Sequence, residues 1–530
     1  MLDAIGDVFD VRFEERTFGA DVGLDAWVLH EEDAKSMRRF ANCQLPCYVV
    51  IRADQLVPCG LSPIIEFSRC HALPPLLMGR QIKAAEAAEL MSLPRHLGDM
   101  TILASKSDAP VWATQDSEGL RHHYVATPVP ELNDGEPLFQ YFHGRQFLKL
   151  LPLVLFVRAL TDDKGWEQPP LHACFMLDDP NLHWRTYGFV NFSDIAAHAE
   201  LHNYHVSFAT IPLDTWFVHK PTAALFKEHR DQLSLLIHGN DHIAQELARP
   251  YVDDELSANL RQALRRIEEF ERRSGVEVSK VMAPPHGACS ERALAAMAHL
   301  GFEAASISRG SLRHYNGGAN WVRILGMKPS DIIAGLPVFY RFPLSESCHN
   351  SVLIAALLHQ PIIAVGHHQD VAEGLQLLAD LSGFVNSLGT VYWTDMKRIA
   401  RSHYAQRFDG GILRVRMFTG HIQMNLPDGA SQLWVERPWV QVAESLPLAW
   451  RIAGDASEWR LCDPNEPIPV LPRQRIEICS GPPRLPFVDT KNLRNFHLWP
   501  VARRQLTEAR DRLTPVLRRC SAFLTKSNGT

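Results

Sequence analysis

The chain has few of the features that mark secreted, membrane-spanning or disordered proteins. Its most apolar window, residues 147–160, is shorter than the roughly 20 residues that a membrane-spanning helix needs, and holds Lys149 and Arg158, so it predicts a buried helix. The first 19 residues carry acids where a secretory signal peptide would carry Lys or Arg. The ten cysteines form no CxxC pair. We therefore expect a reduced, cytoplasmic protein without a transmembrane segment.

A strong charge of either sign is also missing. The formal net charge is −6 over 530 residues and the pI is near 6.5, which excludes a molecule that is electropositive overall and binds nucleic acid. With 46% hydrophobic residues the chain can fill folded cores, so disorder is excluded as well. The length suggests about three domains.

The pattern of apolar and polar residues divides the chain into four stretches. Residues 1–150 alternate short apolar runs with helix-like polar stretches such as 81–92, which is typical of an α/β domain. This first stretch has neither a Gly-rich phosphate loop nor a nucleophile elbow, and its role stays open. Residues 410–480 favour a small β-rich domain. Residues 481–530 predict a linker and a basic helical tail, either a solvated helix or one that docks a protein partner or an anionic membrane surface.

Residues 165–408 alternate more regularly. Seven apolar runs are each followed by a turn and usually by an amphipathic helix. The clearest helix spans 254–273, with apolar residues every three or four positions, acids in its first turn and Ser-Gly at its end. Such alternation indicates a parallel sheet with covering helices, and seven candidate strands favour a barrel over an open doubly wound sheet.

Clusters of polar residues follow four of these predicted strands, at the point where each strand ends. They are Asp178 and Asp179 after the first strong strand, His238 and His242 after the third, Pro285 and His286 after the fourth, and His367 and His368 after the last. Taken singly, each cluster has an ordinary explanation as a helix cap, a shared helix face or a loop. Because the carboxyl ends of parallel barrel strands face the same mouth, their common placement favours one site.

The residue types in these clusters suit metal-assisted hydrolysis. One carboxylate and two histidines are a known set of protein ligands for catalytic zinc, and they leave one position for water. Such a metal lowers the pKa of its water, while an unligated carboxylate can serve as general base and a histidine as acid. We expect one divalent metal, zinc as first choice, although Co²⁺, Ni²⁺ and Fe²⁺ suit the same ligands.

Two of the clusters resemble motifs of the polysaccharide deacetylases, metal-dependent enzymes on a distorted (β/α) barrel that remove acetyl groups from N-acetylated sugars. The run FMLDD is similar to the family's first motif, and HGNDH is similar to its second. The resemblance covers about residues 170–400. It implies that Asp178 is the base and that Asp179, His238 and His242 are the metal ligands.

The remaining motifs match in part. In APPHG, Pro285 and Gly287 match the third motif, whereas His286 replaces an aromatic residue. Ala283 stands where the family has an arginine that orients the base, which leaves that function without a residue. In HGNDH, Gly239 replaces the usual hydroxyl residue and with it a hydrogen bond that steadies the loop.

The run VGH is similar to the family's final motif, which makes His367 the candidate acid, with its neighbour His368 as the alternative. Trp184 can offer an apolar face to a sugar ring, although packing within a loop would explain it equally well. The residues that we expect to contact substrate at the mouth are Asn181, Trp184, Pro285 and His286.

The sequence thus predicts a hydrolase in which a metal-bound water removes an acetyl group from an acetylated amino sugar. One alternative is an amidase that acts on a non-sugar C–N bond through the same chemistry. Another is a carbohydrate- or metal-binding protein without turnover, which Ala283 would favour. Without an export signal, a lipid-linked or soluble biosynthetic intermediate is the expected substrate.

Overall fold

The structure is a computed structural model. It describes residues 1–19, 21, 23–32, 43–94, 100–117, 119–144, 146–162, 165–439, 447–454, 458–481 and 498–527. The chain forms two compact units. Unit 1 comprises residues 1–164, 318–328 and 347–358, and unit 2 comprises 165–317, 329–346 and 359–530. The two short segments lie within the stretch of regular alternation, but they pack with unit 1.

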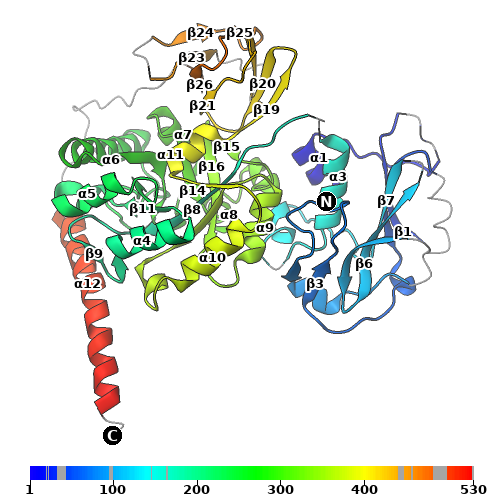
Figure 1. The fold of residues 1–530 in the computed structure, drawn as a ribbon, viewed down its shortest axis with the longest axis horizontal. Coiled ribbons are helices and arrows are strands. Elements are labelled where there is room, and N and C mark those ends of the chain that lie inside the picture. Colours follow the sequence, from blue (N-terminus) through cyan, green and yellow to red (C-terminus); the bar gives the residue numbers. More distant parts are fainter. Residues whose placement is uncertain are drawn as a thin grey trace. The chain divides into compact units, whose positions relative to one another are not determined.

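Unit 2 is built on a closed barrel of parallel strands (Figure 1). In barrel order the strands are β11 (Val206–Thr210), β12 (Leu233–Ile237), β13 (Val278–Met282), β14 (Ala304–Ile307), β16 (Leu336–Pro343), β17 (Ile362–Gly366) and β8 (Leu171–Asp178). Strand β8 pairs with β17 on one side and β11 on the other, which closes the ring. The predicted seven-stranded (β/α) barrel is confirmed.

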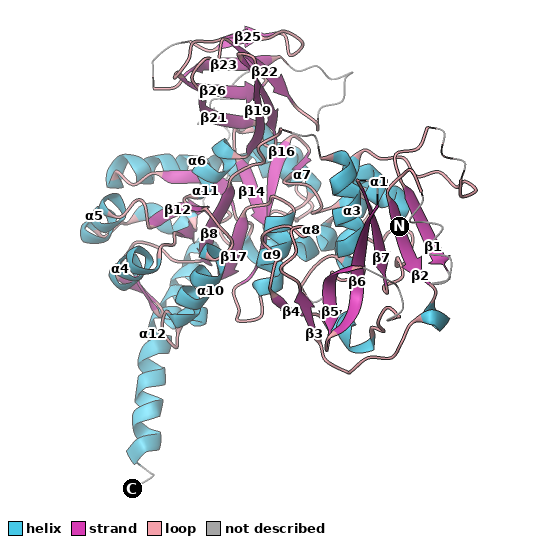
Figure 2. Ribbon diagram, turned by 45° about the vertical axis from the view of Figure 1, so that its right-hand side comes forward, coloured by secondary structure: helices cyan, strands magenta, loops and turns pink. Residues whose placement is uncertain are grey.

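Helices surround the barrel, as both ribbon views show (Figures 1 and 2). They are α4 (Phe192–His202), α5 (Lys220–Glu228), α6 (Asp253–Ser274), α7 (Glu291–His299), α8 (Arg309–Tyr315), α10 (Gln376–Asn386) and α11 (Met396–Ser402). The helix predicted from apolar spacing is α6, which is followed by its C-cap Gly275 with φ 68°. Two further strands join the sheet: β15 (Asp331–Ile333) beside β16, and β18 (Val391–Trp393) beside β8.

Strand β8 is buried on both faces, which explains its continuous apolar run. Cys174 and Met176 belong to the core cluster inside the barrel. Phe175 faces the other way and packs against Trp393 with ring centroids 4.9 Å apart. Because side chains alternate along a strand, Asp178 shares the inward direction of Met176. The strand thus delivers a carboxylate to the carboxyl end of the barrel interior.

The β-rich part of unit 2 is two four-stranded sheets packed around a shared apolar core. One sheet holds β19 (Tyr404–Asp409), β20 (Ile412–Met417), β22 (Gln432–Glu436) and β25 (Ile468–Pro469). The other holds β21 (His421–Asn425), β26 (Arg475–Ser480), β23 (Leu448–Ile452) and β24 (Arg460–Cys462). Inward residues alternate along β20 and β21, as the sequence pattern predicts.

The basic tail forms one long helix, α12 (Leu498–Ser527). Both views show its C-terminal half extending past the barrel (Figures 1 and 2). Its first half lies against the barrel, where Arg504, Glu508 and Asp511 are buried. A search of the described helices found no span that is both long and apolar enough to cross a bilayer.

Unit 1 contains a mixed seven-stranded sheet. Its strands, in sheet order, are β1 (Trp27–Glu32), β2 (Cys47–Ile51), β7 (Leu120–Val125), β6 (Ala109–Ser117), β5 (Thr101–Lys106), β3 (Ile64–Phe67) and β4 (Gln81–Lys83). Its helices include α1 (Leu2–Phe9), α3 (Leu151–Thr161) and α9 (His349–Leu357). The buried helix predicted near 147–160 is α3. The expectation of a helix over 81–92 is wrong, because that stretch forms β4 and a short 3₁₀ turn, Ala85–Glu89.

Candidate active site at the barrel mouth

The two consecutive aspartates at the end of β8 both face the barrel mouth. Asp178 is the last residue of the strand, and Asp179 follows it with φ 84°, in the left-handed region. Successive strand residues would point in opposite directions, so this backbone turn lets both carboxylates serve one site. A non-glycine residue in this conformation costs about 1–3 kcal/mol, and such strain is concentrated at functional sites.

Asp179 lies beside the two histidines that follow β12. Its Oδ1 is 3.2 Å from His242 Nε2 and 3.8 Å from His238 Nε2. One ligand atom from each of the three residues lies within 4.8 Å of the others, and no second group with this geometry occurs among the described residues. Asp179 Oδ1 is buried and accepts no hydrogen bond in the described part of the chain. A convergence of unshared lone pairs fits a divalent cation with nitrogen and oxygen ligands.

The protonation states of Asp179 and His238 suit a metal as well. Burial lowers the pKa of His238 to about 4, so the ring is neutral at pH 7. Its Nδ1 lies 2.7 Å from the carbonyl oxygen of Ala283, to which it donates, and this leaves Nε2 free to coordinate. Burial raises the pKa of Asp179, but the two histidines and Arg504 outweigh that effect and hold it below the usual range.

The loop that carries both histidines is held by Glu246. The buried Glu246 carboxylate accepts hydrogen bonds from the backbone N–H groups of Asn240, Asp241 and His242 at 3.0, 2.8 and 3.1 Å. Gly239 has φ 65°, and a Cβ there would collide with Glu246 and lie 2.5 Å from Pro285 Cγ. The loop therefore needs glycine at 239, and its carboxylate anchor replaces the expected hydroxyl contact.

Asp178 has an arginine partner that does not come from the third motif. Arg341 Nη1 of β16 donates to both carboxylate oxygens of Asp178 at 3.0 Å, and both side chains are buried. Ala283 thus does not leave the carboxylate without a cation. The sequence carries a signal for this residue, since Arg341 is the one charged residue in the apolar run VFYRF.

The two histidines after β17 differ in exposure and in their contacts. His367 is exposed, and it is close enough to His286 to help lower the pKa of that ring, after burial and His242. His368 is buried with its ring 5.8 Å from that of Phe189, and its Nε2 is 3.7 Å from Asp511 Oδ1 of α12. His367 is therefore the accessible member of the pair, and its side chain accepts a hydrogen bond from the backbone N–H of Asp370.

Of the four residues expected to contact substrate, two are exposed and two are buried. His286 is exposed, and its ring centroid is 5.0 Å from that of His242. Trp184 is 59% exposed and can meet a ligand. Asn181 is buried: its Nδ2 donates to Asp214 at 3.2 Å, and its Oδ1 accepts from Arg512 at 3.0 Å. Pro285 is buried as well. Asn181 and Pro285 are therefore less accessible than His286 and Trp184, and their contact with substrate stays a prediction.

The basic helix α12 contributes to the mouth, which the sequence pattern does not predict. Arg504 Nε donates to Asp214 Oδ2 at 2.6 Å, and Nη2 donates to the carbonyl of Asp179 at 3.0 Å. One turn along, Glu508 lies 3.1 Å from His183 Nδ1. The sequence does not single out Arg504 and Glu508 within the basic tail, because their partners Asp214, Asp179 and His183 lie some 300 residues earlier in the chain.

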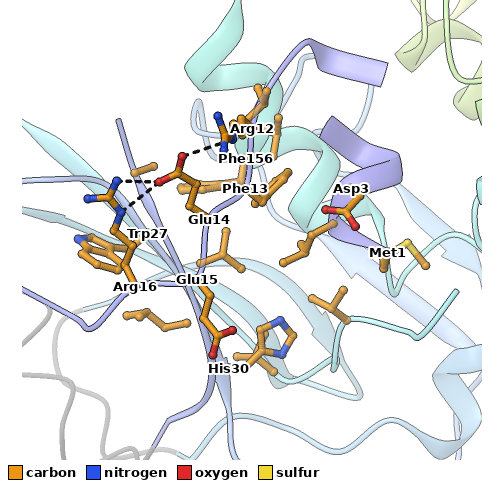
Figure 3. Close-up of a pocket in the computed structure, with 18 of the residues that line it drawn as sticks. Met1, Asp3, Arg12, Phe13, Glu14, Glu15, Arg16, Trp27, His30 and Phe156 are labelled. Carbon is orange, nitrogen blue, oxygen red and sulfur yellow. Dashed lines mark hydrogen bonds and ion pairs between the residues drawn. The ribbon is translucent and has the colours of Figure 1, made fainter. Parts of the chain in front are cut away.

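A second hollow lies in unit 1, lined by residues of the N-terminal segment, β1 and α3. Its volume is about 1760 Å³. Figure 3 shows Glu14 between Arg12 and Arg16, with ion-pair distances of 3.3 and 2.7 Å. The group of three residues that could hold a metal ion, among the described residues, lies at the barrel mouth and not in this hollow.

Comparisons with known proteins add structural neighbours. No family model and no curated protein matches the sequence. Agd3, a novel carbohydrate deacetylase, covers 91% of this chain and 96% of its own, at 9% identity and a TM-score of 0.47. A family 4 carbohydrate esterase from Streptomyces lividans covers 42% of this chain and 92% of its own, at 10% identity and a TM-score of 0.26.

A third neighbour is BA3943, a CE4 family pseudoenzyme from Bacillus anthracis. It covers 44% of this chain and 66% of its own, at 11% identity and a TM-score of 0.26. Because these identities and TM-scores are low, the role of each residue rests on the geometry of the site itself. The first two of these neighbours carry the names of a carbohydrate deacetylase and a carbohydrate esterase.

Proposed function

We propose that this protein is a metal-dependent hydrolase that removes the acetyl group from an N-acetylated sugar. The observation that carries the proposal is the meeting of Asp179, His238 and His242 within 4.8 Å at the barrel mouth, beside the carboxylate of Asp178. Three protein ligands and a neighbouring carboxylate outside the ligand set are the arrangement that metal-assisted amide hydrolysis needs.

The metal would be held by Asp179, His238 and His242. Zinc is the first choice for two imidazoles and one carboxylate, and Co²⁺, Ni²⁺ and Fe²⁺ are further candidates. When bound, such an ion supplies Lewis acidity, which polarises the acyl carbonyl and lowers the pKa of water. The Nδ1 contact of His238 with Ala283 fixes the tautomer that coordination requires.

Asp178 is the proposed general base, which takes a proton from the attacking water. Its buried carboxylate is held by Arg341, so it has one orientation and cannot swing away from the site. A positioned base of this kind contributes about 10²–10⁴-fold to a rate. In the family, an arginine at the position of Ala283 orients the base. Arg341 would do this here.

His367 is the proposed general acid, which gives a proton to the departing nitrogen. Its exposure supports this assignment over His368, which is packed against Phe189 and Asp511. The exposed indole of Trp184 offers a face on which a sugar ring can stack. His286, next to His242, is placed to contact the acyl group or its neighbours.

Acetate release tests this proposal. Purified protein loaded with Zn²⁺ should release acetate from N-acetylated hexosamine oligomers, and His242→Ala should lose both the metal and the activity. His314→Ala is the matched control, since His314 is an exposed histidine of α8 that does not belong to the cluster. Stoichiometric metal in His242→Ala would contradict the ligand set. Release from small non-sugar amides alone would indicate an amidase, and metal without any turnover would indicate a binding protein.

A further inference from the structure

Two of the proposed metal ligands lie in backbone conformations that side chains other than glycine rarely adopt. Asp179 has φ 84° and His242 has φ 54°. A left-handed backbone persists at such residues only where the surroundings hold it. The atoms that hold these two residues are therefore part of what places their side chains.

Consecutive arginines of α12 hold both residues. Arg504 Nη2 donates to the carbonyl oxygen of Asp179 at 3.0 Å, and Arg503 Nη1 donates to the carbonyl oxygen of His242 at 3.0 Å. Arg504 is itself fixed, because its Nε binds Asp214 at 2.6 Å and its Nη2 also binds the hydroxyl of Tyr187 at 3.0 Å. It is 3% exposed, so solvent does not replace these contacts.

We infer that Arg503 and Arg504 are positioning residues for the metal site, and that α12 is part of the active centre. The inference rests on the proposed function, which assigns Asp179 and His242 as ligands. In this arrangement the C-terminal helix clamps the main chain of two ligands that follow different strands, β8 and β12. The clamp sets the separation between the carboxylate and the imidazole before any metal binds.

The positive charge of Arg504 opposes metal binding, whereas its hydrogen bonds position a proposed ligand. Its Nη1 lies 4.0 Å from Asp179 Oδ1 and has no hydrogen-bond partner among the described residues. A lone cation there would repel a metal ion. Asp214, which is buried and 2.6 Å away, offsets that charge. The positional effect therefore dominates, and loss of the clamp should weaken metal binding.

The test is metal affinity of the full-length apoprotein, measured by calorimetric titration with Zn²⁺ and by the visible absorption of bound Co²⁺. Removing Arg504 alone would leave Asp214 as an unpaired buried charge, so the clamp variant is Arg504→Met with Asp214→Asn. This double variant and Arg503→Ala should each raise the Zn²⁺ dissociation constant about 10–100-fold, the usual effect of losing an outer contact to a metal ligand. The Co²⁺ spectrum should change with it.

Arg518→Ala is the matched control, because Arg518 lies on the same helix and pairs with Glu373, away from the ligands. It should bind Zn²⁺ as the unaltered protein does. If both clamp variants bind Zn²⁺ within twofold of the unaltered protein, the inference is overturned, while acetate release by the unaltered protein would leave the proposed function standing. If the double variant does not fold, Arg503→Ala decides. If the unaltered protein binds no metal, both the function and the clamp are refuted.

Discussion

Arg341 reaches Asp178 from a strand that is not its neighbour. Its Nη1 lies 3.0 Å from both carboxylate oxygens, although β17 stands between β16 and β8 in the barrel. The contact therefore crosses the barrel interior, where Phe339, two residues earlier on β16, already faces inward. An arginine inside a barrel is costly unless it is paired, so this ion pair indicates a functional requirement.

Replacing this arginine should affect catalysis more than metal binding. Arg341→Met leaves Asp178 buried without its partner, which should destabilise the protein by about 3–5 kcal/mol and lower kcat at least about tenfold. Metal content, measured by elemental analysis, should stay stoichiometric. Arg401→Met is the control, because Arg401 pairs with Glu303 at 2.8 Å outside the site and should leave kcat unchanged. Equal kcat values for the two variants would contradict the role of Arg341.

Substitution of the two adjacent aspartates should affect metal binding differently. Asp178→Asn should keep the metal and lose about 10²–10⁴-fold in kcat, because an amide cannot accept the proton. Asp179→Asn should lose metal affinity as well as activity, since it removes an anionic ligand. Metal titration and steady-state kinetics on both variants measure this difference. An Asp178→Asn enzyme with nearly full turnover would eliminate the base assignment.

His367 and His368 should also differ. His367→Ala should abolish the basic limb of the pH–rate profile with its metal content intact, because no group would remain to protonate the leaving nitrogen. His368→Ala should keep that limb and lower the thermal stability, since its ring packs between Tyr187 and Phe189. The reverse pattern would identify His368 as the acid. If both variants retain normal profiles, His286 becomes the candidate.

Gly239 should tolerate no side chain. Gly239→Ala adds a Cβ 2.5 Å from Pro285 Cγ at a residue with φ 65°, so the loop must move and carry His238 and His242 with it. Zn²⁺ affinity should fall at least about tenfold by calorimetry, the lower end of the effect of disturbing ligand supports. Gly383→Ala is a control with open space around the added methyl group on α10. Unchanged affinity in Gly239→Ala would show that the loop can rearrange.

Docking of α12 should depend on pH through Glu508. Burial raises the pKa of Glu508, but His183 and Arg512 outweigh it and lower the pKa from 4.5 to about 2. Because the folded state binds the proton more weakly, the stabilisation is complete above about pH 4.5 and is lost as the pH falls towards 2. Glu508→Gln should cost about 1.5–3 kcal/mol at pH 7 and progressively less below pH 4.5.

Urea unfolding of the unaltered protein and of Glu508→Gln at pH 7, 5, 4 and 3, with metal removed by chelation, measures the difference in their free energies of unfolding. Arg510→Ala is a suitable comparison, because Arg510 is largely exposed and its loss leaves Glu508 with both partners. A stability difference between Glu508→Gln and the unaltered protein that stays constant down to pH 3 would exclude this linkage.

The local sequence was enough to predict the barrel and the strand ends. The run over β8 is apolar at every position up to Asp178 apart from His172, and α6 shows apolar spacing with acids in its first turn and a glycine after its last residue. These are short-range properties, set by which face of one element is buried. Parallel barrel strands end at one mouth, so the predicted strand ends also brought Asp179, His238 and His242 together. The cluster in the structure has this arrangement.

Contacts between distant elements were decided only by the tertiary structure. Nothing local distinguishes Arg504 from the other arginines of the tail, because its burial depends on Asp214 and Asp179, some 300 residues earlier. The same is true of Arg341 and Asp178. Charged side chains find partners by closeness in space, which sequence spacing does not encode. The sequence by itself therefore determined the barrel strands, most of the helices and the meeting of Asp179, His238 and His242, and the packing of the chain decided which charges hold these residues in place.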